Sequence, residues 1–137
     1  MRSGFGCSWL HVTGRRVRST TVLLASLFCV VPSAFSATVV CSGTVVVLSY
    51  HATGQLMLRL SDMNQPVLIC TPDTAWSVAG VSYVTPPEAC KAMYATFLAA
   101  RVSGLPVNNV YFDGDAVPSA CNAWQPWSGA QIRHYLF

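Results

Sequence analysis

Beyond residue 37, short apolar runs are separated by turn-forming residues, a pattern typical of a β-rich domain. The first run is rich in β-branched residues, and the second alternates leucines with other side chains. Such runs favour strands that bury one face or both. We therefore predict an antiparallel meander of three strands, at residues 38–48, 55–60 and 67–70.

One segment has the composition and the end signals of a helix. Residues 88–103 are rich in Ala, Leu, Met and Lys, which favour helices. Pro87 suits the first turn, because its missing N–H would have no partner there, and Gly104 suits the C-terminal cap. Placing the residues by angle puts one apolar stripe toward the sheet. That stripe consists of Ala89, Cys90, Met93, Phe97 and Ala100.

The opposite side of this helix carries almost no charge. Its residues are Ala92, Ala95, Leu98, Ala99 and Val102. Two interpretations remain open, because alanines are good helix formers in any setting, but a small apolar face also suits a contact with another subunit. The sequence therefore offers residues 88–103 as a candidate surface for a homo-oligomer.

Two further strands are predicted after the helix. Residues 107–112 form the first and end at a turn, and residues 131–137 form the second, after a loop at 118–129 that contains proline and tryptophan. The expected fold class is mainly β with one α-helix. The order of three strands, one helix and two strands is that of a small five-stranded oligonucleotide/oligosaccharide-binding (OB) barrel, with the helix between strands 3 and 4.

Residues 1–36 have the pattern of a removable signal peptide. An arginine-rich stretch precedes an uncharged apolar run at 21–31, and the small residues Ala34 and Ser36 suit cleavage after Ser36. The apolar run is about half as long as the roughly 20 residues of a membrane span, so no stable membrane anchor is expected. We therefore expect a single secreted or periplasmic domain at 37–137.

Removal of residues 1–36 changes the charge of the protein. The whole chain has a formal net charge of +3, but residues 37–137 keep only four basic residues against five acidic ones, a net charge of about −1. The four cations are scattered along the sequence. A phosphate backbone is bound by clustered basic residues, so nucleic acid is not an expected partner.

Candidate catalytic groups are few. A nucleophilic mechanism needs Ser or Cys near a His and an orienting acid, but residues 37–137 contain only His51 and His134 and no Gly-x-Ser-x-Gly sequence. Asp113 and Asp115 flank Gly114, a spacing more typical of a turn than of acid–base catalysis. No Cys-x-x-Cys pair or nucleotide loop is present. We expect no enzymatic activity, no cofactor and no metal.

Candidate ligand-binding residues are aromatic. Trp124 and Trp127 flank Gln125-Pro126 in the long loop, and indole rings can pack on apolar surfaces while their N–H groups still donate. Tyr50 and His51, at a strand end, form a second candidate patch. The alternative for the two tryptophans is that they fill one end of the barrel.

The helix and the segment after it resemble those of a known family. Trp76 precedes the helix, and Ser103-Gly104-Leu105-Pro106-Val107 leads into the aromatic strand Val110-Tyr111-Phe112. This arrangement is similar to the B subunits of pertussis-like bacterial toxins, of the subtilase cytotoxin type, and small exported bacterial proteins share the same general pattern. The resemblance implies an OB-like fold and an exported module that binds a glycan or a protein, and it implies no site residue. The alternative is a periplasmic structural or inhibitor-like protein without a small-molecule site.

Residues 37–137 contain four cysteines, an even number that predicts two disulfides in an exported chain. Four cysteines allow three connectivities. In the expected barrel, the start of the first strand lies near the end of the fourth. We therefore predict the pairs Cys41–Cys121 and Cys70–Cys90.

Overall fold

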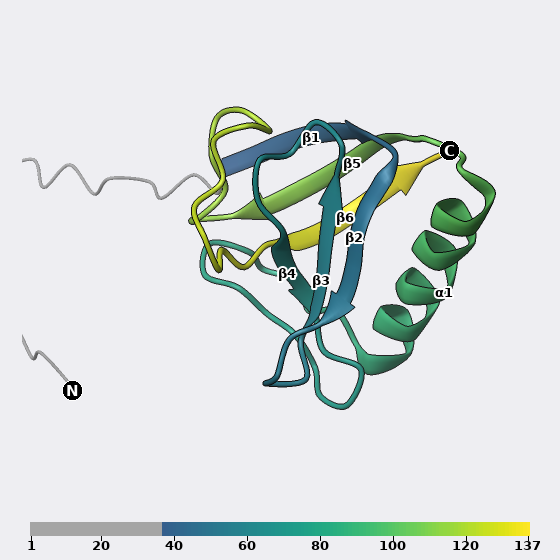
Figure 1. Ribbon diagram of the computed structural model, residues 1–137. Helices are drawn as coiled ribbons and strands as arrows, with labels where there is room; N and C mark the ends of the chain where they lie inside the picture. Colours follow the sequence, from purple (N-terminus) through teal and green to yellow (C-terminus); the bar gives the residue numbers. More distant parts are fainter. Residues whose placement is uncertain (1–36) are drawn as a thin grey trace, which may run out of the picture. The chain divides into compact units, whose positions relative to one another are not determined.

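The computed structural model describes residues 37–137, so the predicted signal peptide at 1–36 lies outside the described residues. One helix and six strands make up this part of the chain (Figure 1). The helix α1 (Pro87–Ser103) follows the fourth strand. The strands are β1 (Ala37–Gly43), β2 (Val45–Tyr50), β3 (Leu56–Leu60), β4 (Val67–Cys70), β5 (Val107–Gly114) and β6 (Gln131–Leu136). The predicted class, mainly β with one helix, is confirmed.

The predicted first strand is wrong in one respect, because residues 38–48 belong to two strands. Gly43 has a φ of +120°, a conformation that side chains disfavour, and the chain bends there. A Cβ at this position would collide with the Ser61 side chain. Ser61 also holds the bend, since its hydroxyl accepts the Thr44 N–H at 3.2 Å and its own N–H donates to the Thr44 carbonyl at 3.0 Å. The domain therefore has six strands instead of five, and the helix lies between the fourth and fifth.

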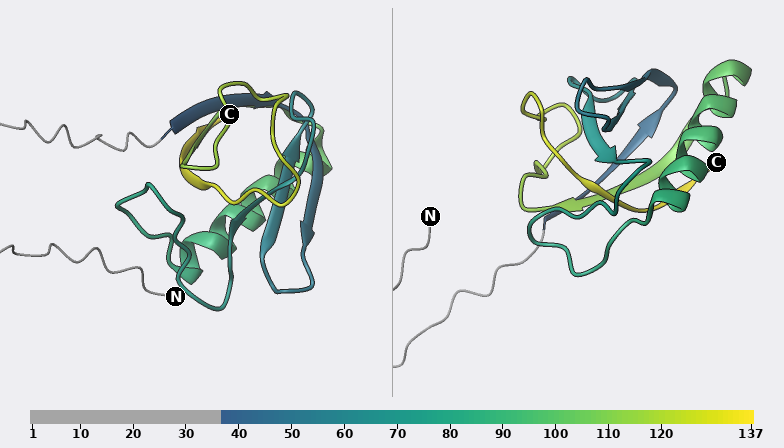
Figure 2. Two further views of the ribbon diagram at one scale, coloured as in Figure 1. Left: turned by 90° about the vertical axis from the view of Figure 1, so that its left-hand side faces the viewer. Right: turned by 90° about the horizontal axis from the view of Figure 1, so that it is seen from below.

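The strands form two antiparallel sheets of three strands each, ordered β1-β5-β6 and β2-β3-β4. One isolated parallel bridge, Leu68 to Gly129, joins β4 to the segment just before β6. β4 is only four residues long and does not pair with β6 itself. The predicted closed barrel is therefore not present within residues 37–137. Figure 2 shows the two sheets curving around a common interior.

The helix lies against this interior through the stripe that the sequence predicts. Cys90, Met93, Phe97 and Ala100 are its buried residues. Pro87 occupies the first turn, and Gly104 caps the C-terminus with a φ of +69°. α1 is too short and too polar to cross a bilayer, and the described residues contain no other candidate span.

Both disulfides connect elements that are distant in sequence. Cys41 of β1 is bonded to Cys121 in the β5–β6 loop, and Cys70 of β4 is bonded to Cys90 of α1. These are the two predicted pairs. The first one anchors the long loop between β5 and β6, which carries the candidate tryptophans.

Candidate functional site

The two tryptophans of the long loop have opposite environments. Trp124 is 1% exposed and lies in the core, with its ring edge-to-face on Phe112 at a centroid distance of 5.4 Å. Trp127 is 64% exposed. The alternative that the indoles fill the domain interior therefore applies to Trp124, whereas Trp127 is available to a ligand.

Trp127 lies beside the other predicted patch. The rings of His51 and Trp127 are in edge-to-face contact, with centroids 4.9 Å apart and planes at 65°. His51 begins the β2–β3 turn, where its N–H donates to the Gln55 carbonyl at 2.8 Å. Its Nδ1 is also 2.8 Å from the Thr53 hydroxyl. The fold thus brings together two candidate residues that are far apart in sequence.

The backbone around Trp127 is held from both sides. Pro126 restricts the chain before it, and the Ser128 hydroxyl donates to the Gln125 carbonyl at 2.9 Å. After it, the Ser128 carbonyl accepts the Leu68 N–H at 2.9 Å. Trp127 itself has a φ of +65° and is the only non-glycine residue with positive φ among the described residues. This conformation costs about 1–2 kcal/mol for an L-residue, so the surrounding contacts must impose it.

Trp127 also borders a hollow on the surface. Gln65, Pro66, Pro126 and Trp127 line it, and its volume is about 210 Å³. Two prolines and an indole make its walls stiff, because proline has a fixed φ. We call the group His51, Gln65, Pro66, Pro126 and Trp127 the Trp127 surface.

Tyr50 does not belong to this surface. Its ring packs against Tyr94 of α1, with a centroid distance of 5.4 Å. The pKa of Tyr50 is raised above its ordinary value, first by burial and then by the charges of Tyr94 and Asp73. Although Tyr50 is 47% exposed, it faces the helix and not Trp127.

Asp113 and Asp115, at the end of β5, differ in burial. Asp113 is 2% exposed, whereas Asp115 is exposed. The Asp113 carboxylate accepts hydrogen bonds from the Thr38 hydroxyl and the Tyr83 hydroxyl, each at 2.7 Å. It also accepts two from Arg133, through Nε at 2.8 Å and Nη2 at 2.9 Å. This network joins β1, β5, β6 and the segment before the helix, and the local sequence contains no signal for it.

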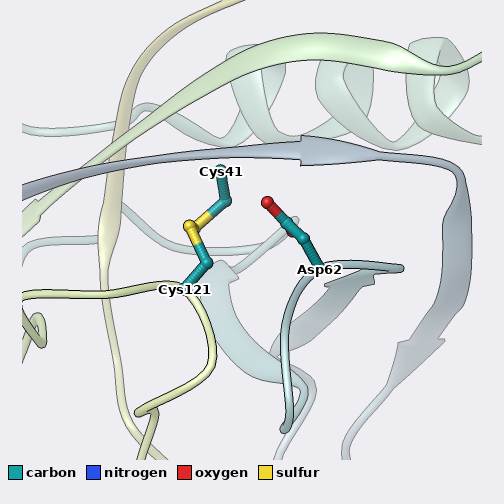
Figure 3. A group of neighbouring side chains, drawn as sticks. All are labelled: Cys41, Asp62 and Cys121. Atoms are coloured by element: carbon teal, nitrogen blue, oxygen red, sulfur yellow. A yellow bond between two sulfur atoms is a disulfide. The ribbon is translucent and has the colours of Figure 1, made fainter.

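Asp62 lies beside the first disulfide (Figure 3). One ligand-type atom from each of Cys41, Asp62 and Cys121 lies within 4.8 Å of the others. The two sulfur atoms are bonded to each other, and metal ions bind thiolates. The Asp62 carboxylate instead accepts the Ser42 N–H at 2.7 Å. In the oxidised protein this group holds a loop to β1 and offers no pair of sulfur ligands.

Comparison with known proteins finds no matching family model, curated protein or solved structure.

Proposed function

We propose that this domain is an exported binding module that recognises a glycan through the Trp127 surface. The observation that carries the proposal is an exposed indole held in an unfavourable backbone conformation by its neighbours. Strain of this kind is concentrated at functional sites. An indole face packs well on the less polar face of a sugar ring, and the imidazole of His51 beside it adds a hydrogen-bonding group.

The position of the surface in the fold supports a binding role. Only Thr44 separates β1 from β2, so the two can be regarded as one bent strand, and the element order is then that of an OB-fold. OB-folds bind oligosaccharides and oligonucleotides through the loops between strands 1 and 2 and between strands 4 and 5. In this numbering, His51 lies in the first of these loops and Trp127 in the second. The resemblance to toxin B subunits also implies an OB-like fold, so we include it in the proposal.

The replacement Trp127→Ala tests this role. We expect it to abolish binding of the glycans that the unchanged protein selects from an array, because the indole supplies most of the apolar contact. The free energy of unfolding should change by less than about 0.5 kcal/mol, as for other exposed positions. The control is Val84→Ala, which removes an exposed apolar side chain that belongs to neither the Trp127 surface nor the outer side of α1.

Three results would count against the proposal. Loss of binding in Val84→Ala would mean that removing any exposed apolar side chain abolishes binding, and full binding by Trp127→Ala would remove the indole from the site. An array on which the folded, unchanged protein binds no glycan would favour the structural or inhibitor-like alternative.

We further propose that the outer side of α1 contacts a second copy of the chain. Its small residues Ala92, Ala95 and Ala99 are exposed, and Leu98 and Val102 on the same side are 39% and 81% exposed. A hollow of about 330 Å³ lies next to this side, lined by Ala99, Leu105 and Phe137 among others. Apolar surface of this kind is typical of a protein contact.

The replacement Ala95→Glu should dissociate such an oligomer without unfolding the monomer. A carboxylate at the centre of an apolar interface would lose its hydration without gaining a partner. Light scattering with circular dichroism measures both effects. A control, Ala116→Glu, introduces the same charge at an exposed alanine outside the helix. An unchanged protein that is monomeric at high concentration would contradict the proposal.

A further inference from the structure

Arg59 lies on the outer face of the β2-β3-β4 sheet. Along β3, Leu58 and Leu60 are fully buried, so the residue between them points to the other face. Arg59 pairs with Val47 of β2. On its other side, Leu58 pairs with Val67 in antiparallel register, which places Arg59 opposite Pro66.

This position makes Arg59 a neighbour of the Trp127 surface. Pro66 lines the hollow beside Trp127. His51 and Gln55, which close the hairpin, follow the same alternation and lie on the same outer face as Arg59. Figure 1 shows β3 running between β2 and β4, so Arg59 lies on the central strand of this sheet.

The guanidinium of Arg59 has no partner in the domain. No hydrogen bond or ion pair joins it to another residue of 37–137, and its Nε is shielded from solvent without an acceptor. The other two arginines of this part of the chain differ, because Arg101 donates to the Leu48 carbonyl and Arg133 to Asp113. The shielded Nε–H is out of reach of a ligand, but the two Nη groups are not shielded in this way and have no partner within residues 37–137, so they can donate to an acceptor that a ligand supplies.

We propose that Arg59 binds an oxyanion of the ligand, so that the binding site extends from Trp127 across the outer face of β3. The link between Arg59 and the glycan site rests on the proposed binding role of the Trp127 surface. The anion site at Arg59 does not depend on that role. A guanidinium donates two parallel hydrogen bonds to a carboxylate or to a sulfate or phosphate group. One isolated cation on a domain of net charge about −1 suits a ligand with single anionic groups and not a polyanionic backbone.

The first experiment detects the anion site without knowledge of the ligand. The protein is purified after export from cells that express the full chain, and the arginine Nε–H signals are followed by 15N NMR. Acetate, sulfate and phosphate are added in separate titrations, which distinguish the three sources of an oxyanion. We expect the Arg59 signal, identified by its loss in Arg59→Gln, to shift saturably with at least one of them. An Arg59 signal that does not saturate with any, or that moves no more than that of Arg101, would overturn the inference.

The second experiment links the anion site to the glycan site. Arg59→Gln and the control Arg101→Gln lose the same charge, and both are compared with the unchanged protein on the glycan array. We expect Arg59→Gln alone to weaken binding of acid-bearing glycans about 10- to 100-fold, as for a lost charge-assisted hydrogen bond, and to keep binding of neutral ones. Equal binding of acidic glycans by both variants would overturn the link to Arg59.

The two proposals fail in different ways. If the unchanged protein binds no glycan but the Arg59 signal still saturates, the glycan proposal fails and the anion site stands. If Trp127→Ala abolishes glycan binding while the Arg59 signal does not respond, the anion site fails and the glycan proposal stands.

Discussion

Replacing Trp124 with alanine is expected to destabilise the domain by about 3–5 kcal/mol, the usual cost of truncating a large buried aromatic side chain. The ring is 1% exposed and packs edge-to-face on Phe112. For a domain of this size, each kcal/mol lowers the melting temperature by about 4–8 °C, so the loss should exceed 10 °C. Urea unfolding of the disulfide-bonded protein measures the change directly.

The same loop supplies the control for this prediction. Trp127→Ala removes an identical side chain that is 64% exposed, and it should leave the unfolding midpoint nearly unchanged. Trp124→Phe should cost less than the alanine replacement, because it keeps a ring in the core and also removes an indole N–H that is buried without an acceptor. Similar losses for both alanine variants would contradict the assignment of one tryptophan to the core and the other to the surface.

Local signals explain why the helix and the disulfides could be predicted. Pro87 and Gly104 mark the helix ends by their own conformational limits, and the spacing of Cys90, Met93 and Phe97 identifies the buried stripe. The disulfide pairs followed from the order of elements alone. That order was sufficient even though the barrel is not closed, because β1 still pairs with β5 and so brings Cys41 near the loop of Cys121.

Long-range contacts explain what could not be predicted. The strand break at Gly43 depends on the space that Ser61 occupies. Trp124 and Trp127 lie in a loop without periodicity. The Asn64 side chain holds Trp124 inside, because it accepts from the backbone N–H of Trp124 and donates to its backbone carbonyl. Nothing in the local sequence separates these two indoles. The contact of His51 with Trp127 and the free guanidinium of Arg59 likewise require the folded arrangement.

Replacing the buried carboxylate of Asp113 is also expected to destabilise the domain strongly. Asp113→Asn should destabilise the domain by about 2–3 kcal/mol at neutral pH, because an amide presents N–H groups to donors that need an acceptor. The value lies below that of a fully buried ion pair, since the Arg133 side chain is 52% exposed and can return to water. Asp115→Asn, two residues away and exposed, is the matched control and should have little effect.

The pH dependence of unfolding provides an independent test of Asp113. Burial alone would raise the pKa of this carboxyl, but hydrogen bonds from Thr38, Tyr83 and Arg133, together with the charge of Arg133, hold it below the ordinary value. A lowered folded-state pKa means that the stabilisation is present above the unfolded pKa of about 3.9 and is lost as the pH falls through the folded-state pKa. The unchanged protein should therefore lose more stability between pH 5 and pH 2 than Asp113→Asn does. Equal acid sensitivity of the two proteins in urea unfolding would show that other carboxyl groups dominate.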